Sequence, residues 1–202
     1  LRGQNNVQGA CDMGSFPHEL PGYRHISDSA TRTLFENEWH VKLLDEPGLR
    51  IPNMFEAALD GSFKGLYVQG EDIVQSDPNT QHVTAAMKNL EGLVVHDLFL
   101  NETAKFAHVF LPGSSFLEKN GTFTNAERRI SPVRKVMPAL AGKGDWEVTV
   151  ALSNAMGYPM DYKHPSQIMD EIARLTPTFT GVSYAKLDKL GSIQWPCNAA
   201  HP

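Results

Sequence analysis

Short polar motifs follow three apolar segments of this sequence. They are Gly70-Glu71-Asp72, His96-Asp97 and Gly113-Ser114-Ser115. If the segments are parallel strands, all three motifs lie at the carboxyl edge of one sheet, where α/β proteins bind ligands. Glycine lets a ligand approach the backbone, and carboxylates accept hydrogen bonds from ribose hydroxyls or from the N–H groups of a base. The motifs therefore indicate a nucleotide-containing ligand.

Two asparagines, Asn79 and Asn101, open the helices expected to follow this edge. The free backbone N–H groups at a helix N-terminus can bind phosphate, which agrees with a nucleotide. Neither G-x-G-x-x-G nor G-x-x-x-x-G-K-[ST] occurs, so the sequence has no NAD fingerprint and no Walker loop. Acids at strand ends also cap helices and turns. For Asp72 and Asp97 taken singly, a ligand contact and a structural role are equally supported.

The segments that must position these motifs alternate between strand and helix. Strands are predicted at 64–69, 92–96 and 107–111, with helices at 80–90 and near 102–106. This order and spacing predicts right-handed βαβ crossovers and a parallel sheet. The strands show little alternation of polar and apolar residues, as is typical when both sheet faces are covered. The predicted fold class is α/β, with a parallel Rossmann-like αβα sheet unit.

Flanking segments extend this unit on both sides. Residues 1–28 are rich in Gly, Pro, Asn and His, and we expect an ordered loop there. A hairpin is expected at 116–125, turning at Lys119-Asn120-Gly121. Further helices are predicted at 29–39, 53–59, 145–156, 165–175 and 183–190, with Ser27 or Asp28 capping the first and Asp145 capping the third.

Size and charge exclude several classes of protein. The chain has 202 residues, a net charge of −5 and a pI near 5.9, whereas a nucleic-acid surface usually has a basic excess. No apolar run is long enough to cross a bilayer, and no signal segment opens the chain. Two isolated cysteines, Cys11 and Cys197, favour reduced thiols and a cytoplasmic protein. The histidines show no H-x-x-x-H spacing, so a protein-ligated metal is not expected.

A basic stretch follows the predicted hairpin, at Glu127-Arg128-Arg129 and Arg134-Lys135. A solvated face is the simpler interpretation of such a charge run. A surface for an anionic phosphate or carboxylate is the alternative.

The beginning of the chain carries a long and specific motif. The thirteen residues from Arg2 to Gly14, RGQNNVQGACDMG, resemble a signature of formate dehydrogenase large subunits. These enzymes use a molybdenum or tungsten ion held by two pterin guanine dinucleotides (bis-MGD). The likeness covers nearly the whole chain and includes Pro21-Gly22-Tyr23, Gly70-Glu71-Asp72, His96-Asp97, Phe99, Leu111-Pro112, Glu118, Gly121-Thr122-Phe123-Thr124, Glu127-Arg128, Asp145-Trp146, Met156-Gly157-Tyr158-Pro159 and Gln194-Trp195-Pro196.

The resemblance implies a reaction and roles for individual residues. The family oxidises formate to carbon dioxide and passes two electrons through the metal to iron–sulfur clusters. Arg2 is similar to the arginine that orients the substrate carboxylate, a role that suits a planar and permanently charged guanidinium. Gln4 would lie beside the metal and one pterin, so Arg2 and Gln4 are the catalytic candidates. The cofactor-binding candidates are Gln4, Gly70, Asp72, Ser76, His96, Asp97, Gly113 and Asp145.

The resemblance also implies that the chain is an internal piece of a larger multidomain oxidoreductase. The expected parts are an active-site and cofactor loop (1–28), an α/β dinucleotide-binding unit (29–115), a hairpin with a basic connection (116–144) and a helical segment that completes the cofactor region (145–202). The isolated piece would be inactive. Its partners would be formate, the remainder of the large subunit, and iron–sulfur or flavin electron-transfer subunits.

Two further points come from the resemblance. The family's cysteine or selenocysteine metal ligand and its 4Fe-4S cysteines belong to an upstream part of the subunit. No metal ligand is therefore assigned here, and Cys11 does not match that position. His96 stands where relatives can have Gln, and Gly113 stands where Ser can occur.

Three alternative functions remain open. An oxyanion reductase of the same molybdopterin architecture would share the fold, although the Arg2–Gly14 motif favours formate. A non-catalytic structural relative, like the large iron–sulfur subunit of respiratory NADH dehydrogenase, would not need Arg2, Gln4 or the acidic strand ends. A generic nucleotide-binding module would not explain the polar opening segment.

Overall fold

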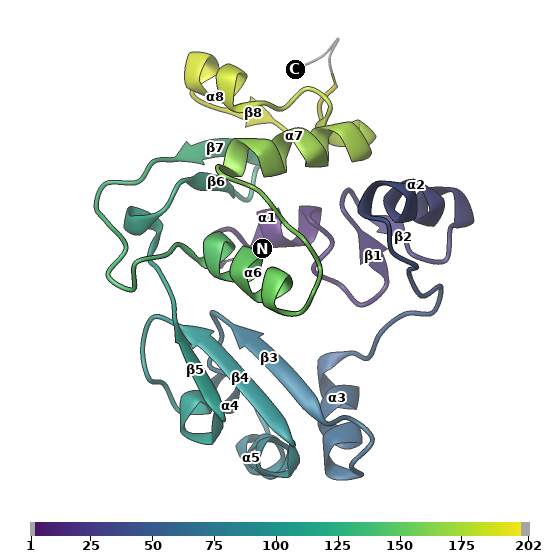
Figure 1. Ribbon diagram of the computed structural model, residues 1–202, viewed down its shortest axis with the longest axis vertical. Helices are drawn as coiled ribbons and strands as arrows, with labels where there is room; N and C mark the ends of the chain where they lie inside the picture. The colour runs from purple at the N-terminus through teal and green to yellow at the C-terminus, as the bar shows by residue number, and fades with distance from the viewer. Residues whose placement is uncertain (1–2, 199–202) are drawn as a thin grey trace. The chain divides into compact units, whose positions relative to one another are not determined.

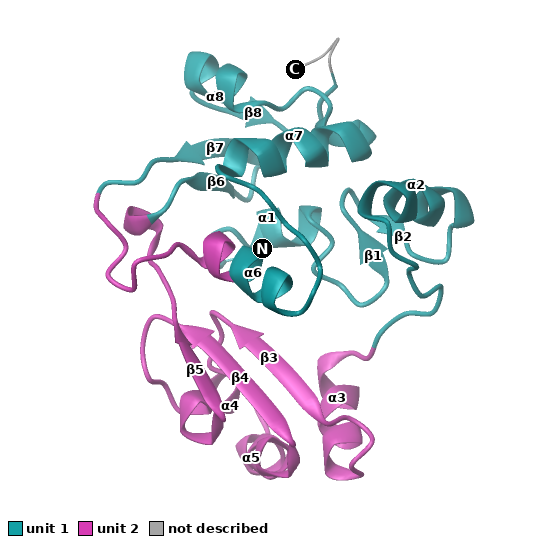
Figure 2. Cartoon of the chain, viewed as in Figure 1, with its two compact units in different colours: residues 1–48, 119–136, 149–202 teal, residues 49–118, 137–148 magenta. Residues whose placement is uncertain are grey.

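The computed structural model describes residues 3–198, and the chain divides into two compact units. Unit 1 consists of Leu1–Gly48, Lys119–Val136 and Thr149–Pro202. Unit 2 consists of Leu49–Glu118 and Met137–Val148 (Figure 2). The chain thus leaves unit 1, builds most of unit 2, and returns twice.

Unit 2 is built on a three-stranded parallel sheet (Figure 1). The strands are β3 (Gly65–Gln69), β4 (Gly92–Asp97) and β5 (Val109–Pro112), with β4 in the centre. In this register Gln69 pairs with His96, which pairs with Leu111 on the other side. The predicted parallel α/β sheet is confirmed, and the three polar motifs leave it at one edge.

Four short helical elements accompany this sheet. They are α3 (Ile51–Leu59), α4 (Ile73–Ser76), α5 (Thr80–Asn89) and the 3₁₀ turn η1 (Thr103–Phe106). The predicted cap of α5 is confirmed, because the side-chain oxygen of Asn79 accepts a hydrogen bond from the backbone N–H of His82 (3.2 Å). Helix α3 begins two residues earlier than predicted, since Pro52 is well tolerated in a first helical turn.

The core of unit 2 lies on one face of the sheet. Leu93 and Val95 of β4 form a buried cluster with Val83 and Met87 of α5. Val94, between the two strand residues, is only half-buried. Burial therefore alternates along β4 more strongly than the apolar sequence indicated, because successive side chains of a strand point to opposite faces.

The first part of unit 1 contains more regular structure than the predicted loop. It forms α1 (Val7–Asp12), the two-residue strands β1 (Glu19–Leu20) and β2 (Arg24–His25), and α2 (Ser29–Trp39). The prediction of a loop over 1–28 is wrong at α1, β1 and β2, since Gln8 Nε2 donates to Asp12 Oδ1 (2.7 Å) across one turn of α1. Helix α2 has its predicted bounds and its predicted Asp28 cap.

The hairpin of unit 1 lies further along the chain than predicted. Its strands are β6 (Gly121–Thr124) and β7 (Arg129–Val133), and β8 (Ile193–Gln194) pairs with β7. The predicted turn at Asn120 is wrong, and the residues before β6 form the 3₁₀ turn η2 (Phe116–Glu118) in unit 2. The turn is made by Asn125, whose Oδ1 accepts from the backbone N–H groups of Glu127 (3.1 Å) and Arg129 (2.9 Å).

The remaining helices agree closely with the sequence. They are α6 (Asp145–Ala155), α7 (Pro165–Leu175), the 3₁₀ turn η3 (Pro177–Phe179) and α8 (Tyr184–Leu190). Ile130, Leu187 and Trp195 belong to the buried cluster that joins α7 and α8 to the hairpin strands. None of the helices within residues 3–198 is long and apolar enough to span a membrane.

The Asn125 turn gives a test of the hairpin. Asn125→Ala removes the acceptor of two backbone N–H groups and should lower the free energy of unfolding by about 1 kcal/mol. Asn125→Asp keeps the oxygen and should change it by less than about half of that amount. Equilibrium urea unfolding of the chain measures both variants. An equal loss in the two would show that the side-chain oxygen is not what stabilises this turn.

Candidate functional site

Gly70 is the first residue beyond β3 at the carboxyl edge of the sheet. Its φ of +65° lies in the left-handed region, and a Cβ built there would meet no atom within 4 Å. Its backbone N–H donates to the carbonyl oxygen of His96 (2.9 Å), so the turn is tied to the end of β4. A ligand can approach this backbone closely, and only glycine adopts the conformation without strain.

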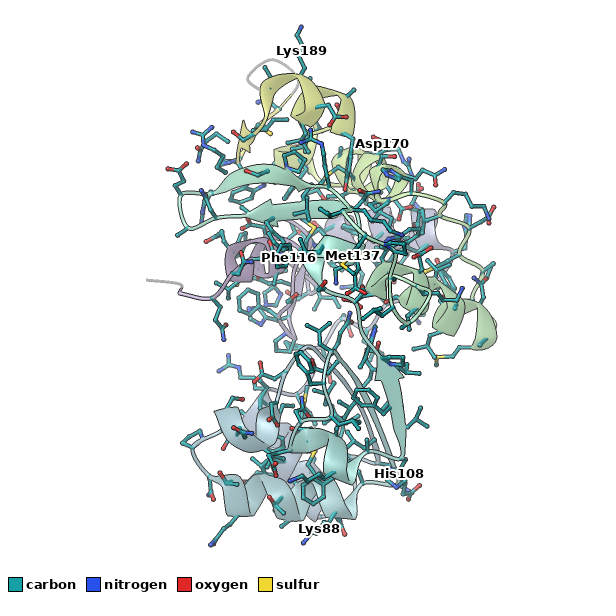
Figure 3. All side chains as sticks on the ribbon, turned by 90° about the vertical axis from the view of Figure 1, so that its left-hand side faces the viewer. Lys88, His108, Phe116, Met137, Asp170 and Lys189 are labelled. Atoms are coloured by element: carbon teal, nitrogen blue, oxygen red, sulfur yellow. The ribbon has the colours of Figure 1, made fainter. Side chains whose placement is uncertain are left out.

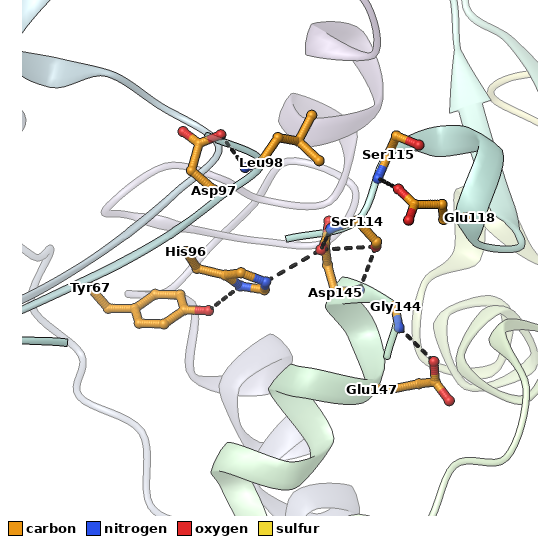
Figure 4. A network of polar contacts seen from close by, with 10 residues as sticks. All are labelled: Tyr67, His96, Asp97, Leu98, Ser114, Ser115, Glu118, Gly144, Asp145 and Glu147. Atoms are coloured by element: carbon orange, nitrogen blue, oxygen red, sulfur yellow. Dashed lines mark hydrogen bonds and ion pairs between the residues drawn. The ribbon is translucent and has the colours of Figure 1, made fainter. Parts of the chain in front are cut away.

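His96 lies at the same edge between two polar side chains of unit 2 (Figure 4). Its Nδ1 is 2.7 Å from the hydroxyl oxygen of Tyr67, and its Nε2 is 3.3 Å from Asp145 Oδ1. The second contact is at ion-pair distance but lacks hydrogen-bond geometry, and buried Nε2 has no hydrogen-bond partner among the described residues. The structure thus brings His96 and Asp145 together, as their shared assignment to the cofactor site requires.

Asp145 is held by the segment that leaves β5. Its Oδ1 accepts hydrogen bonds from the backbone N–H (2.8 Å) and the hydroxyl (3.0 Å) of Ser114. Asp145 was expected to cap α6, but it is the first helical residue, and Glu147 Oε2 instead accepts from Gly144 N (2.6 Å). The Asp145 carboxylate is therefore directed to the sheet edge rather than to its own helix.

Asp72 is engaged by unit 2 itself. Its Oδ1 accepts from the backbone N–H (3.0 Å) and hydroxyl (2.6 Å) of Thr103, and its Oδ2 accepts from Glu102 N (3.3 Å). Burial raises the pKa of the Asp72 carboxyl, but the hydrogen bonds from Thr103, Glu102 and Gln75 outweigh it and leave the pKa below its ordinary value. This geometry supplies a structural role, and a ligand contact at Asp72 stays a prediction.

Asp97 and Gly113 also meet at the edge. Gly113 N donates to the carbonyl oxygen of Asp97 (2.8 Å), and a Cβ on Gly113 would lie 3.0 Å from the Asp97 carbonyl carbon. The Asp97 carboxylate accepts from Leu98 N (2.6 Å) and from Asn101 Nδ2 (2.9 Å). A side chain at 113 would therefore pack tightly against this backbone, and glycine fits there without displacing it. Ser76 is exposed and donates its hydroxyl to Glu71.

The catalytic candidates belong to unit 1. Arg2 lies outside the described residues, and Gln4 is exposed in the bend that precedes α1. Helix α1 is anchored by the buried Asp12, whose Oδ1 accepts from Gln8 Nε2 (2.7 Å) and from the Tyr23 hydroxyl (2.9 Å). These contacts tie α1 to Tyr23.

The basic stretch is largely paired within unit 1. Arg129 Nε lies 2.8 Å from Glu127 Oε1, and Arg134 Nη2 lies 2.9 Å from Asp188 Oδ1. The Arg128 guanidinium stacks 4.8 Å from the ring centroid of Trp195. These contacts favour the solvated-face interpretation over an anion-binding surface. Within residues 3–198, no group of three or more His, Cys, Asp or Glu side chains is placed to hold a metal ion.

Tyr67 and Ser114 were not among the predicted site residues. Tyr67 lies two residues before Gln69, which pairs with His96, so Tyr67 and His96 share one face of the sheet as diagonal neighbours. Once the register is known, that spacing places the phenol beside the imidazole. Ser114 belongs to a predicted strand-end motif, but its contact with residue 145 is not local in sequence.

Comparison with protein families shows which family the chain belongs to. Residues 2–155 match the model of the molybdopterin oxidoreductase family. The chain belongs to that family. The resemblance to molybdopterin enzymes predicted from the sequence is therefore confirmed.

Relatives and a solved structure add detail. The chain is 46% identical over 200 residues to "Probable oxidoreductase YjgC" of Bacillus subtilis (strain 168), covering 98% of this chain and 20% of that protein. It is 48% identical over 203 residues to "Putative formate dehydrogenase SAB2186c" of Staphylococcus aureus (strain bovine RF122 / ET3-1), covering 100% and 20%. Acetylene hydratase from Pelobacter acetylenicus has the same fold, with a TM-score of 0.60, 19% identity, and coverage of 84% of this chain and 24% of that one. The chain spans about a fifth of the length of its curated relatives.

Asp72 gives a test that depends on pH. Asp72→Asn should lower the free energy of unfolding at neutral pH by about 1 kcal/mol, as for the loss of a helix cap. Because the folded-state pKa of Asp72 lies below its ordinary value, the carboxylate stabilises the fold fully above that ordinary value and less as the pH falls through the folded-state pKa. The difference between variant and parent should therefore shrink below about pH 4. Urea unfolding across this pH range measures it.

The matched control is Asp170→Asn, at an exposed carboxylate of α7 (Figure 3). It should leave the unfolding free energy unchanged at every pH. A constant difference for Asp72→Asn from neutral to acid pH would contradict the assigned role of its charge.

Proposed function

We propose that this chain is part of the large subunit of a molybdenum or tungsten formate dehydrogenase. Unit 2 binds a guanine dinucleotide half of the bis-MGD cofactor at the carboxyl edge of β3, β4 and β5. Residues near the start of the chain serve the substrate, with Arg2 as the carboxylate anchor and Gln4 beside the metal. The other cofactor-binding residues are Gly70, Asp72, Ser76, His96, Asp97, Gly113 and Asp145.

The observation that carries the proposal is the convergence of Gly70, His96 and Asp145 at one sheet edge in a molybdopterin oxidoreductase. Gly70 offers an open and approachable backbone, and His96 presents a buried nitrogen without a hydrogen bond. Asp145 supplies a carboxylate, which matches the N–H edge of guanine. The donor and acceptor set therefore suits the nucleotide part of the cofactor.

The choice of formate is supported by the relatives and by the Arg2–Gly14 motif. Oxidation of formate yields carbon dioxide, one proton and two electrons, and the metal–pterin group, when bound, accepts the electron pair. Arg2 would hold the formate carboxylate through two parallel N–H donors. The electrons would then pass to a 4Fe-4S cluster in the parent subunit and to iron–sulfur or flavin subunits.

Two alternatives make different predictions. An oxyanion reductase would reduce nitrate with a reduced dye as electron donor and would not oxidise formate. A non-catalytic relative would purify without metal and without guanine dinucleotide. The described residues favour a cofactor-binding chain, because a scaffold has no use for a buried imidazole with an unpartnered nitrogen.

The test is Arg2→Lys in the full-length protein. Lysine keeps the charge but has no planar pair of donors, so kcat/KM for formate should fall roughly 10–100-fold. The metal and guanine dinucleotide content should stay unchanged. Arg134→Lys is the matched control, at an exposed ion pair with Asp188, and should keep full turnover. Unchanged turnover in Arg2→Lys would remove Arg2 from the substrate site.

A further inference from the structure

The imidazole of His96 has two buried nitrogen atoms in different situations. Its side chain is 0% exposed, with Nδ1 2.7 Å from the Tyr67 hydroxyl and Nε2 3.3 Å from Asp145 Oδ1. Only Nδ1 makes a hydrogen bond. A buried polar atom without a hydrogen bond is destabilising, so its presence points to a function beyond stability.

The contacts of Tyr67 favour one tautomer of His96. Among the described residues, the Tyr67 hydroxyl has His96 Nδ1 as its hydrogen-bond partner. If the hydroxyl donates to Nδ1, the proton of the neutral ring lies on Nε2 and faces the Asp145 carboxylate. The opposite tautomer would place the Nε2 lone pair against a carboxylate oxygen, which is electrostatically unfavourable.

Tyr67 is suited to remain the donor. Burial, and to a smaller extent the negative charge of Asp145, raise the pKa of the Tyr67 phenol above its ordinary value. The phenol therefore keeps its proton throughout the physiological pH range. Its place on the face of β3 that carries Gln69, the partner of His96 in the register, fixes it beside the imidazole.

We infer that Tyr67 is a positioning residue for the nucleotide site, acting through His96. Its hydroxyl holds His96 as the Nε2–H tautomer, and this N–H orients the Asp145 carboxylate toward the N–H edge of guanine. The inference rests on the proposed function and adds a residue to it. Tyr67 does not touch the nucleotide.

The geometry around Asp145 explains how orientation is achieved. Ser114 N and Ser114 Oγ already donate to Asp145 Oδ1, and His96 Nε2 approaches the same oxygen from the other side of the edge (Figure 4). The two Ser114 hydrogen bonds, together with the His96 imidazole at ion-pair distance from the same oxygen, fix the plane of the carboxylate. A fixed acceptor binds a planar base with less loss of conformational entropy than a mobile one.

The experiment compares variants of the full-length protein that differ in donors and acceptors. Tyr67→Phe removes the donor to Nδ1, and His96→Leu removes both nitrogens. His96→Gln is the conservative rescue, because its amide oxygen accepts from Tyr67 while its NH₂ group donates to Asp145. The readouts are guanine dinucleotide per polypeptide, its release rate after dilution, and melting temperatures of the cofactor-loaded and cofactor-free proteins.

Tyr67→Phe should release the dinucleotide about tenfold faster than the parent, the effect of one hydrogen bond of about 1.4 kcal/mol. His96→Leu should release it faster still, whereas His96→Gln should stay within about threefold of the parent. The melting temperature of the loaded protein should fall more than that of the cofactor-free protein, since only the loaded form loses binding free energy.

His108→Leu is the matched control in the same unit. His108 directly precedes β5, so it lies at the opposite end of the sheet from His96 (Figure 3). Its Nδ1 accepts a hydrogen bond from Leu93 N (2.9 Å). This variant also loses a histidine hydrogen bond but should release the dinucleotide at the parent rate. A change as large as that of His96→Leu would show a general effect of unfolding.

The outcomes separate the inference from the proposed function. A parent protein that contains no guanine dinucleotide would contradict the proposed function itself. A parent that contains it, with Tyr67→Phe releasing it at the parent rate, would overturn the inference alone. The inference would also be overturned if His96→Gln released the dinucleotide as fast as His96→Leu. Equal losses of melting temperature in the loaded and cofactor-free proteins would overturn it too. A merely structural role predicts both outcomes.

Discussion

The parallel pairing of β4 with both of its neighbours is the constraint on which the candidate site depends. Parallel strands end at the same edge, so the residues that follow β3, β4 and β5 must gather there. The register then fixes which residues meet, and places His96 beside Gln69 and Leu111. A shift of one residue in β4 would turn His96 to the opposite face, where Leu93 and Val95 form the core. The site and the hydrophobic core of unit 2 are therefore specified by the same hydrogen-bonded ladder.

Polar side chains at this edge are organised because burial makes unpaired groups costly. Hydrogen bonds to Oδ1 stabilise both carboxylates. The backbone of η1 donates to Asp72, and the segment after β5 donates to Asp145. Asp72 lies in the loop after β3, and Asp145 is the first residue of α6. Each carboxylate connects segments that are distant in sequence. The two carboxylates differ in their surroundings. The hydrogen bonds of Asp72 with Glu102 and Thr103 serve the structure of unit 2, whereas Asp145 lies beside His96 Nε2, a buried nitrogen with no hydrogen bond.

The sequence predicts these elements well wherever the signals are local. Asp28 and Asn79 mark helix starts through caps that involve a residue three positions away, and the structure has them as expected. The hairpin was misplaced because two asparagines compete. Asn120 precedes a glycine, yet its side chain accepts from the backbone of Lys135, while Asn125 organises the turn. That choice depends on the pairing of β6 with β7, which is not a local property.

Long-range contacts explain the other omissions. The pairing of Gln8 and Tyr23 with Asp12 gives regular structure to a segment whose glycines and prolines indicate a loop. Tyr67 was missed for a similar reason, since a tyrosine in an apolar strand is ordinarily explained by packing. Only the register shows that it shares a face with His96. The edge motifs themselves could be predicted, because strand ends are read from the apolar pattern.

The fold does not by itself choose the reaction. Acetylene hydratase from Pelobacter acetylenicus has this fold at 19% identity, so the architecture is compatible with more than one chemistry. The proposed nucleotide-binding edge would be compatible with any of them. Discrimination must come from residues that meet the substrate, and a guanidinium is the group that distinguishes a small carboxylate by geometry as well as charge. Selectivity for formate would therefore be set by Arg2 and its neighbours, whereas the cofactor would be held at the edge of β4.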